Sequence, residues 1–212
     1  MKSFTLRNVK KQAGISLPEM LIVTIIVGLL GILSYSQFGN GSDAVRAKTT
    51  FDAAQKIASS WSLMTQLTGV TGTIAGSSPY SSLVAALNTP LDAVMVGNSP
   101  SGIIATTYEN AYNLSGLKPL SNMATIVTTP SVGVPGSYKI NDYPVTLASA
   151  LVGGMTVLNV VFTGVPDNVV SSIYSSHMSA TFVTGTAVTS GLVQYTAVDA
   201  SGNHTLTLQF NL

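Results

Sequence analysis

One carboxylate stands at the edge of the most apolar part of this sequence. Glu19 is the only charged residue over 15–38, and the stretch 20–33 that follows it is almost wholly aliphatic. A charged side chain at the centre of a bilayer costs about 2.5–3.5 kcal/mol on insertion scales, so a carboxylate here needs a partner. The chemistry that Glu19 offers is electrostatic. In surroundings of low dielectric it would attract a cationic amine strongly, and either charge alone would be costly to bury.

The rest of the chain offers few residues for catalysis. The only histidines are His177 and His204, there is no cysteine, and Asp and Glu together number eight. A metal site would have to be assembled from this small pool, and no nucleophile elbow or glycine-rich phosphate loop occurs. We therefore expect no catalytic residue, no metal and no cofactor, and we expect both histidines at the surface or at strand edges. A hydrolase built from a serine and one histidine is the minor alternative.

The apolar stretch has the length of a membrane helix. With Ser34 and Tyr35 it covers roughly 20 residues, which is enough to cross a bilayer. Basic residues precede it, at Lys2, Arg7, Lys10 and Lys11. By the positive-inside tendency they stay in the cytoplasm, which places everything after Gly39 outside it.

The small residue that a processing enzyme would need lies before the apolar stretch. An ordinary signal peptide has its small-residue cleavage site after the apolar region, whereas here Gly14 precedes it. Cleavage there would leave the apolar helix attached to the mature protein. Pro18 fits a helix that begins at Ile15, because a missing N–H in the first turn has no partner to lose.

Together these residues resemble the type IV prepilin family, which includes the pseudopilins. Its members share a basic leader ending in glycine, a segment of the form small-or-apolar, Ser/Thr, Leu, x, Glu, and an unbroken apolar helix, and the match here covers residues 10–33. The resemblance implies that prepilin peptidase cuts between Gly14 and Ile15 and methylates the new amine of Ile15. Glu19 then becomes the fifth mature residue, which in this family pairs with the N-terminal amine of a neighbouring subunit.

Some residues depart from the commonest family pattern. The first mature residue is Ile15 rather than phenylalanine, and Ser36 stands where many pilins have a helix-bending proline. The 14-residue leader lies between those of classes IVa and IVb, and the start at Ile15 favours class IVb. A simple signal anchor is the alternative, but it would require neither Gly14 nor Glu19.

The sequence divides into a cleaved leader over 1–14, a transmembrane and filament-core helix over 15–38, and an extracytoplasmic headpiece over 39–212. The leader holds four of the nine Lys and Arg residues, which leaves five against eight Asp and Glu and changes the balance from +1 to −3. The mature chain has no basic patch, so we predict no specific nucleic-acid binding. Without cysteine, the headpiece must be held together by its core.

The headpiece is predicted to begin with a helix over about 43–67. Apolar residues recur there at three- and four-residue spacing, which is typical of one buried helix face: Ala47, Phe51, Ala54, Ala58, Trp61 and Met64. Trp61 is predicted to anchor the core. Residues 39–42 are predicted to interrupt the helix, with Ser42 or Asp43 capping its restart. The spacing of Asp43 with Arg46 and of Asp52 with Lys56 predicts ion pairs on the exposed face.

The remaining sequence predicts short helices and strands. A loop is expected over 69–79, a short helix over 80–88, an apolar segment over 90–96 and a helix over 166–177. Strands are expected over 124–128, 137–140, 155–162, 179–183, 192–198 and 204–212, with a hairpin turn over 198–204. The fold class is therefore α+β and pilin-like: one long helix, with a transmembrane half and an amphipathic half, packed on an antiparallel β-sheet.

The expected function is that of a structural subunit of a type IV pilus filament. The favoured role is that of the major pilin. Its precursor would reside in the bacterial inner membrane and the mature subunit in the extracellular pilus. Expected partners are other copies of the chain in a helical homopolymer, prepilin peptidase, the assembly machinery, and membrane lipid before assembly. The alternatives are a minor pilin or pseudopilin of a type II secretion or DNA-uptake system and, outside the family, a membrane-anchored extracellular enzyme or binding module. The surface loops carry no motif that selects among adhesion, motility, DNA uptake and conjugation.

Overall fold

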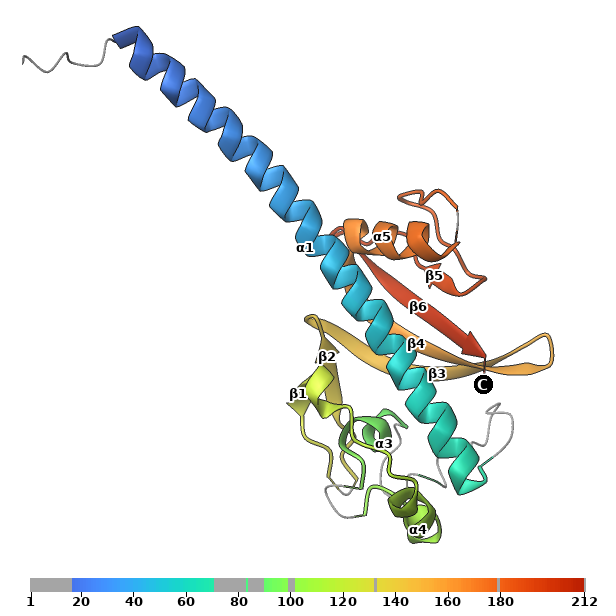
Figure 1. Ribbon diagram of the computed structural model, residues 1–212. Helices are drawn as coiled ribbons and strands as arrows, with labels where there is room; N and C mark the ends of the chain where they lie inside the picture. The colour runs from blue at the N-terminus through green and yellow to red at the C-terminus, as the bar shows by residue number, and fades with distance from the viewer. Residues whose placement is uncertain are drawn as a thin grey trace, which may run out of the picture. The chain divides into compact units, whose positions relative to one another are not determined.

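The computed structural model describes residues 17–70, 83, 90–98, 102–131, 133–178 and 180–211, with side chains from Gly41 onward except that of Leu151. Two compact units divide the chain, Met1–Ser42 and Asp43–Leu212. Helix α1 (Leu17–Thr68) contributes backbone to both, and all other elements belong to the second unit, the headpiece (Figure 1).

The headpiece is built on a six-stranded antiparallel sheet in the order β1-β2-β3-β4-β6-β5. The strands are β1 (Thr125–Thr128), β2 (Ser137–Ile140), β3 (Tyr143–Val152), β4 (Met155–Pro166), β5 (Val193–Tyr195) and β6 (Asn203–Asn211). Two-residue turns join β2 to β3 and β3 to β4. Both residues of each turn have positive φ, at Asn141 (51°) and Asp142 (71°) and at Gly153 (59°) and Gly154 (86°). Turns of this kind match the twist of the paired strands.

Three further helices and a 3₁₀ turn belong to the headpiece in the described part of the chain. They are α3 (Leu91–Val96), α4 (Thr106–Leu114), the 3₁₀ turn η1 (Ser121–Met123) and α5 (Asp167–Met178). Figure 1 shows α5 beside β5 and β6, and it packs against both of them and against β4. Pro166 and Asp167 suit the start of this helix, since a proline fits the boundary and an acidic side chain is favourable in the first turn.

The core lies between the headpiece half of α1 and the sheet. All six apolar residues of the predicted helix face are buried, and Trp61 is fully buried, so both predictions are confirmed. From the sheet, the core receives Tyr138, Ile140, Val145, Leu158, Val160, Phe162, Leu206 and Leu208. The turn before β3 is tied to the helix as well, because the Asn141 amide donates hydrogen bonds to the hydroxyls of Thr49 (2.7 Å) and Thr50 (2.9 Å). These contacts confirm an α+β fold with the long helix packed on an antiparallel sheet, which is compatible with a pilin-like layout.

Several predicted boundaries are confirmed. The helix ends at Thr68, and strands occur at three predicted places, with β4 continuing to Pro166. Helix α5 and strand β6 lie where the sequence predicts them, and the predicted hairpin joins β5 to β6. Strand β5 is shorter than the predicted 192–198. The loop over 69–79 and the helix over 80–88 fall largely outside the described residues.

Other predictions are wrong. Residues 39–42 do not interrupt α1, which is helical throughout. A glycine inside a helix costs about 1 kcal/mol, a penalty that the hydrogen bonds of neighbouring turns offset. Residues 180–183 form no strand. There the ring of Phe182 packs against Tyr195 with centroids 4.9 Å apart, so this segment is placed by an aromatic contact rather than by a strand ladder.

In the described part of the chain, no helix combines the length and the apolar character that crossing a bilayer requires. The side chains of the predicted membrane segment, residues 15–38, lie outside that part. The membrane segment therefore stays a prediction.

Candidate functional site

Of the three residues of the predicted processing and assembly site, the structure describes the backbone of Glu19. Gly14 and Ile15 lie outside the described residues. Glu19 falls within the described backbone of α1, in its first turn, while its side chain is outside the description. Glu19 is thus on a helix that continues without a break into the headpiece, and its pairing remains a prediction.

One hollow of the described headpiece lies between α1 and α5. It has a volume of about 710 Å³, and its lining includes Ala47, Phe51, Ile173 and His177. The rings of Phe51 and His177 stack with centroids 3.6 Å apart and planes 12° apart. His177 is exposed, as predicted. This groove could not be predicted from the sequence, because it depends on how α5 is placed against α1.

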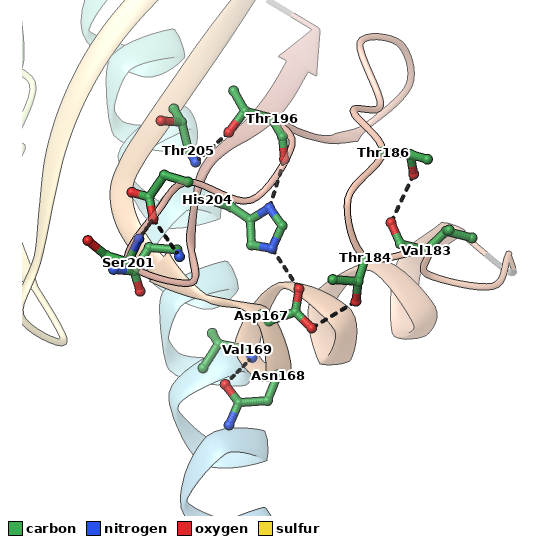
Figure 2. A network of polar contacts seen from close by, with 12 residues as sticks. Asp167, Asn168, Val169, Val183, Thr184, Thr186, Thr196, Ser201, His204 and Thr205 are labelled. Atoms are coloured by element: carbon green, nitrogen blue, oxygen red, sulfur yellow. Dashed lines mark hydrogen bonds and ion pairs between the residues drawn. The ribbon is translucent and has the colours of Figure 1, made fainter.

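A second feature is a polar cluster around His204 (Figure 2). The Nε2 atom of His204 lies 2.8 Å from Oδ1 of Asp167, and Nδ1 lies 2.7 Å from the backbone oxygen of Thr196. The Thr184 hydroxyl donates a hydrogen bond of 3.0 Å to the other oxygen of Asp167. The cluster joins the start of α5, the loop after α5, the end of β5 and the start of β6.

The prediction that His204 lies at the surface or at a strand edge is wrong. It is 2% exposed, and it pairs with Val165 of β4. It lies two residues before Leu206 and four before Leu208, and both leucines are fully buried. Side chains two residues apart point to the same face of a strand, so extending this alternation by two residues would have placed His204 in the core. Histidine is polar, so it was not counted among the apolar residues of this alternation.

Both ring nitrogens of His204 face oxygen atoms that accept hydrogen bonds. A carbonyl oxygen cannot donate, so Nδ1 must carry a hydrogen, and a second hydrogen must lie between Nε2 and Asp167. The ring has no free nitrogen with which to take a proton from a substrate. Thr184 is bonded to Asp167 rather than to the ring, so the cluster lacks the nucleophile–base contact of a hydrolase. What it can do is join separate segments by charge-assisted hydrogen bonds.

A third feature is a buried acidic side chain that sequence reasoning missed. Asp92 of α3 is fully buried, and its Oδ1 accepts hydrogen bonds from the Tyr138 hydroxyl (2.6 Å) and the Gly136 N–H (3.0 Å). Burial, followed by the hydrogen bond and charge of Asp92, raises the pKa of the Tyr138 phenol far above its ordinary value. Asp92 fixes the short helix α3 to the chain that leads into β2.

The two ion pairs predicted on α1 do not form within 4.0 Å. Asp43 instead accepts a hydrogen bond from the side-chain amide of Asn168 in α5. Arg46 lies near the Tyr143 hydroxyl, where its charge partly opposes the rise in the pKa of Tyr143 that burial causes. For Asp43 and Arg46, contacts to α5 and β3 have therefore replaced the predicted contact along the helix. Among the described residues, no group of three or more His, Cys, Asp or Glu side chains could hold a metal ion.

Comparisons of the chain with protein-family models, with curated proteins and with solved structures gave no match.

Proposed function

We propose that this protein is a structural subunit of a type IV pilus, and we favour the role of major pilin over that of minor pilin. The observation that carries the proposal is the order of features at the N-terminus: a basic leader, Gly14, Ile15, Glu19 and then an unbroken apolar stretch. The fold supports it, since α1 is helical from Leu17 to Thr68 and its headpiece half packs on an antiparallel sheet. The resemblance to prepilins assigns each of these residues a role in processing or assembly.

In the proposed mechanism, cleavage after Gly14 creates the charge that Glu19 requires. The new amine of Ile15 is cationic, and in the low dielectric of a filament core it attracts the Glu19 carboxylate of a neighbouring subunit. Leaving either charge unpaired there would cost several kcal/mol, so the pair fixes the axial register between subunits. A head-to-tail contact of this type does not close on itself, and repetition produces a helical filament.

A minor pilin or pseudopilin is the second candidate, because the matching residues 10–33 are shared with those proteins. Abundance separates the two. If the chain is the major pilin, it will be the predominant protein in filaments sheared from the surface of the native bacterium. A few copies per filament would indicate a minor subunit.

Substitution of Glu19 tests the assembly role. We expect Glu19→Ala and Glu19→Val to abolish filaments while the subunit still accumulates in the membrane, because neither side chain can pair with an amine. Asp52→Ala is a matched control, since Asp52 is an exposed carboxylate on the same helix. Filaments would be counted by electron microscopy, and normal numbers in both Glu19 variants would refute the pairing.

A further inference from the structure

The segment 180–192, here called the α5–β5 loop, lies on the surface and contacts the headpiece through Phe182, Thr184, Val188 and Leu192. Most of its residues are exposed. The centroid of its half-buried Phe182 ring lies 4.9 Å from the ring centroid of Tyr195, 5.8 Å from that of His204 and 6.5 Å from that of Tyr174. The Thr184 hydroxyl bonds to Asp167, and Val188 forms a backbone bridge with Tyr195. His204 and its carboxylate partner Asp167 therefore each hold one anchor of this loop.

The number of protons shared by His204 and Asp167 determines whether all these contacts can coexist. With Nδ1 bonded to the Thr196 oxygen at 2.7 Å and Nε2 to Asp167 at 2.8 Å, the two side chains hold two protons between them. This count is the same whether the second proton resides on the ring or on the carboxyl group. Removing one proton turns a nitrogen lone pair toward an oxygen lone pair, and one of the two bonds must break.

Titratable groups from α5, from the turn before β6 and from β5 lie around the His204 ring. Asp167 of α5 contacts it directly, and Asp199, in the turn before β6, interacts electrostatically with it. Hydrogen bonds from the backbone of Asn203 and Ser201 keep the pKa of Asp199 below its ordinary value, so this second carboxylate is ionised. Tyr195 of β5 is a further titratable neighbour, with its ring centred 5.7 Å from that of His204, and Tyr174 of α5 packs in turn on Tyr195.

We infer that His204 is a proton-controlled latch for the α5–β5 loop. In the protonated form the ring holds Asp167 in place, Asp167 accepts from Thr184, and Phe182 packs on the ring edge. Loss of the proton separates the ring from Asp167 or from Thr196, which weakens the Thr184 and Phe182 anchors together. The loop is docked at low pH and released as the pH rises. This inference concerns the headpiece alone and stands or falls independently of the pilus assignment.

The chain has no cysteine, so a single spin label can report on the loop. The label would be attached through Val183→Cys, a position 52% exposed in the loop, on the full chain in detergent. When the pH is raised in steps across the range in which the protein stays folded, we expect a reversible, single-proton transition from an immobile to a several-fold more mobile spectrum. A label at the exposed Val134→Cys, outside the loop, is the matched control and should show no transition.

Two further measurements keep the test decisive. In a His204→Gln background the spectrum should not respond to pH, and an unchanged transition there would overturn the latch. If that variant does not fold, nitrogen NMR of the unsubstituted protein gives the protonation of both histidine rings, with exposed His177 as the internal reference. We expect both His204 nitrogens to be protonated when the loop is immobile. A neutral His204 ring and a deprotonated Asp167 in the docked state, or a label spectrum that is identical across the range, would contradict the inference.

Discussion

Asp167 and His204 form a polar contact that joins two elements of the headpiece. His204 is buried in β6 while Asp167 is 41% exposed on its side-chain surface, and their 2.8 Å contact joins a core strand to the first turn of α5. Because one partner is partly solvated, we expect breaking this pair to cost less than breaking a fully buried ion pair but more than breaking an exposed one.

Replacing Asp167 with Asn tests that contribution. Asp167→Asn removes the charge that faces Nε2 of His204, and hydrogen bonds to charged groups contribute about 1.5–3 kcal/mol. We expect the free energy of unfolding at about pH 6 to fall by roughly 1–3 kcal/mol. Urea titration followed by the fluorescence of Trp61, the only tryptophan, measures it. The exposed control Asp52→Asn should change it by less than about 0.5 kcal/mol, and equal effects of the two variants would contradict this account.

Tyr138 makes the stability of the headpiece depend on pH at the alkaline end. Burial and Asp92 raise the pKa of its phenol in the folded protein, whereas in the unfolded chain it loses its proton near pH 10. Above about pH 10 the unfolded state therefore binds fewer protons than the folded state, and the free energy of unfolding falls as the pH rises. In Tyr138→Phe this slope should be shallower, with a remainder from Tyr112 and Tyr143, whose pKa values burial also raises. Identical slopes from about pH 9 to 11 in denaturant titrations would show that Tyr138 ionises equally in both states.

At the scale of elements, the connection between α3 and β2 depends on a position with no room for a side chain. A Cβ atom added at Gly136 would lie 2.4 Å from Oδ1 of Asp92 and 2.4 Å from the Tyr138 hydroxyl, so these groups would have to move apart. We expect Gly136→Ala to destabilise the protein by about 1–3 kcal/mol, which is the usual cost of overpacking. Thermal unfolding followed by circular dichroism measures the loss.

Gly41 supplies the matched glycine control. A Cβ there would meet nothing within 4 Å, and the residue lies inside α1. Gly41→Ala should therefore raise stability by about 0.5–1 kcal/mol, through the lower entropy of the unfolded chain and the higher helix propensity of alanine. A Gly136→Ala variant as stable as Gly41→Ala would show that the contacts around Asp92 are looser than described.

Periodic elements were predictable from the sequence, and elements defined by their neighbours were not. The buried face of α1 and the alternation in β6 each repeat over several turns or residue pairs, and both predictions are confirmed. Strand β3 was missed because Pro144 stands near its start and the small residues 148–150 lack strand character. Pro144 is tolerated there at the second position of the strand, opposite Lys139. Helix α4 was missed as well, since it has only nine residues and only Tyr112 among them is buried.

The polar contacts of the headpiece could not be predicted in the same way. Asp92, Asp167 and His204 come from different elements, and their meeting depends on the sheet order and on the placement of α3 and α5. Short-range spacing on α1 instead predicted ion pairs that the structure replaces with contacts to α5 and β3. Residue spacing in the sequence does not reveal partners that are far apart along the chain.

At the scale of the whole molecule, the proposal joins an N-terminal assembly segment to a headpiece held by its core. The headpiece contains no cysteine, and its core gathers residues from α1, the sheet and α5. The N-terminal segment carries the residues with a proposed processing role, Gly14 and Ile15, together with the proposed register-setting carboxylate Glu19. In the proposed mechanism, processing precedes assembly, because cleavage creates the cationic amine that would pair with Glu19.

The most direct test of this account is the N-terminus of the mature protein, measured by mass spectrometry on the chain isolated from its native bacterium. The account predicts a protein that begins at Ile15 and carries one methyl group on its N-terminal amine, with residues 1–14 removed. A mature chain that still begins at Met1, or one cleaved after the apolar stretch 20–33, would contradict the assignment to the prepilin family.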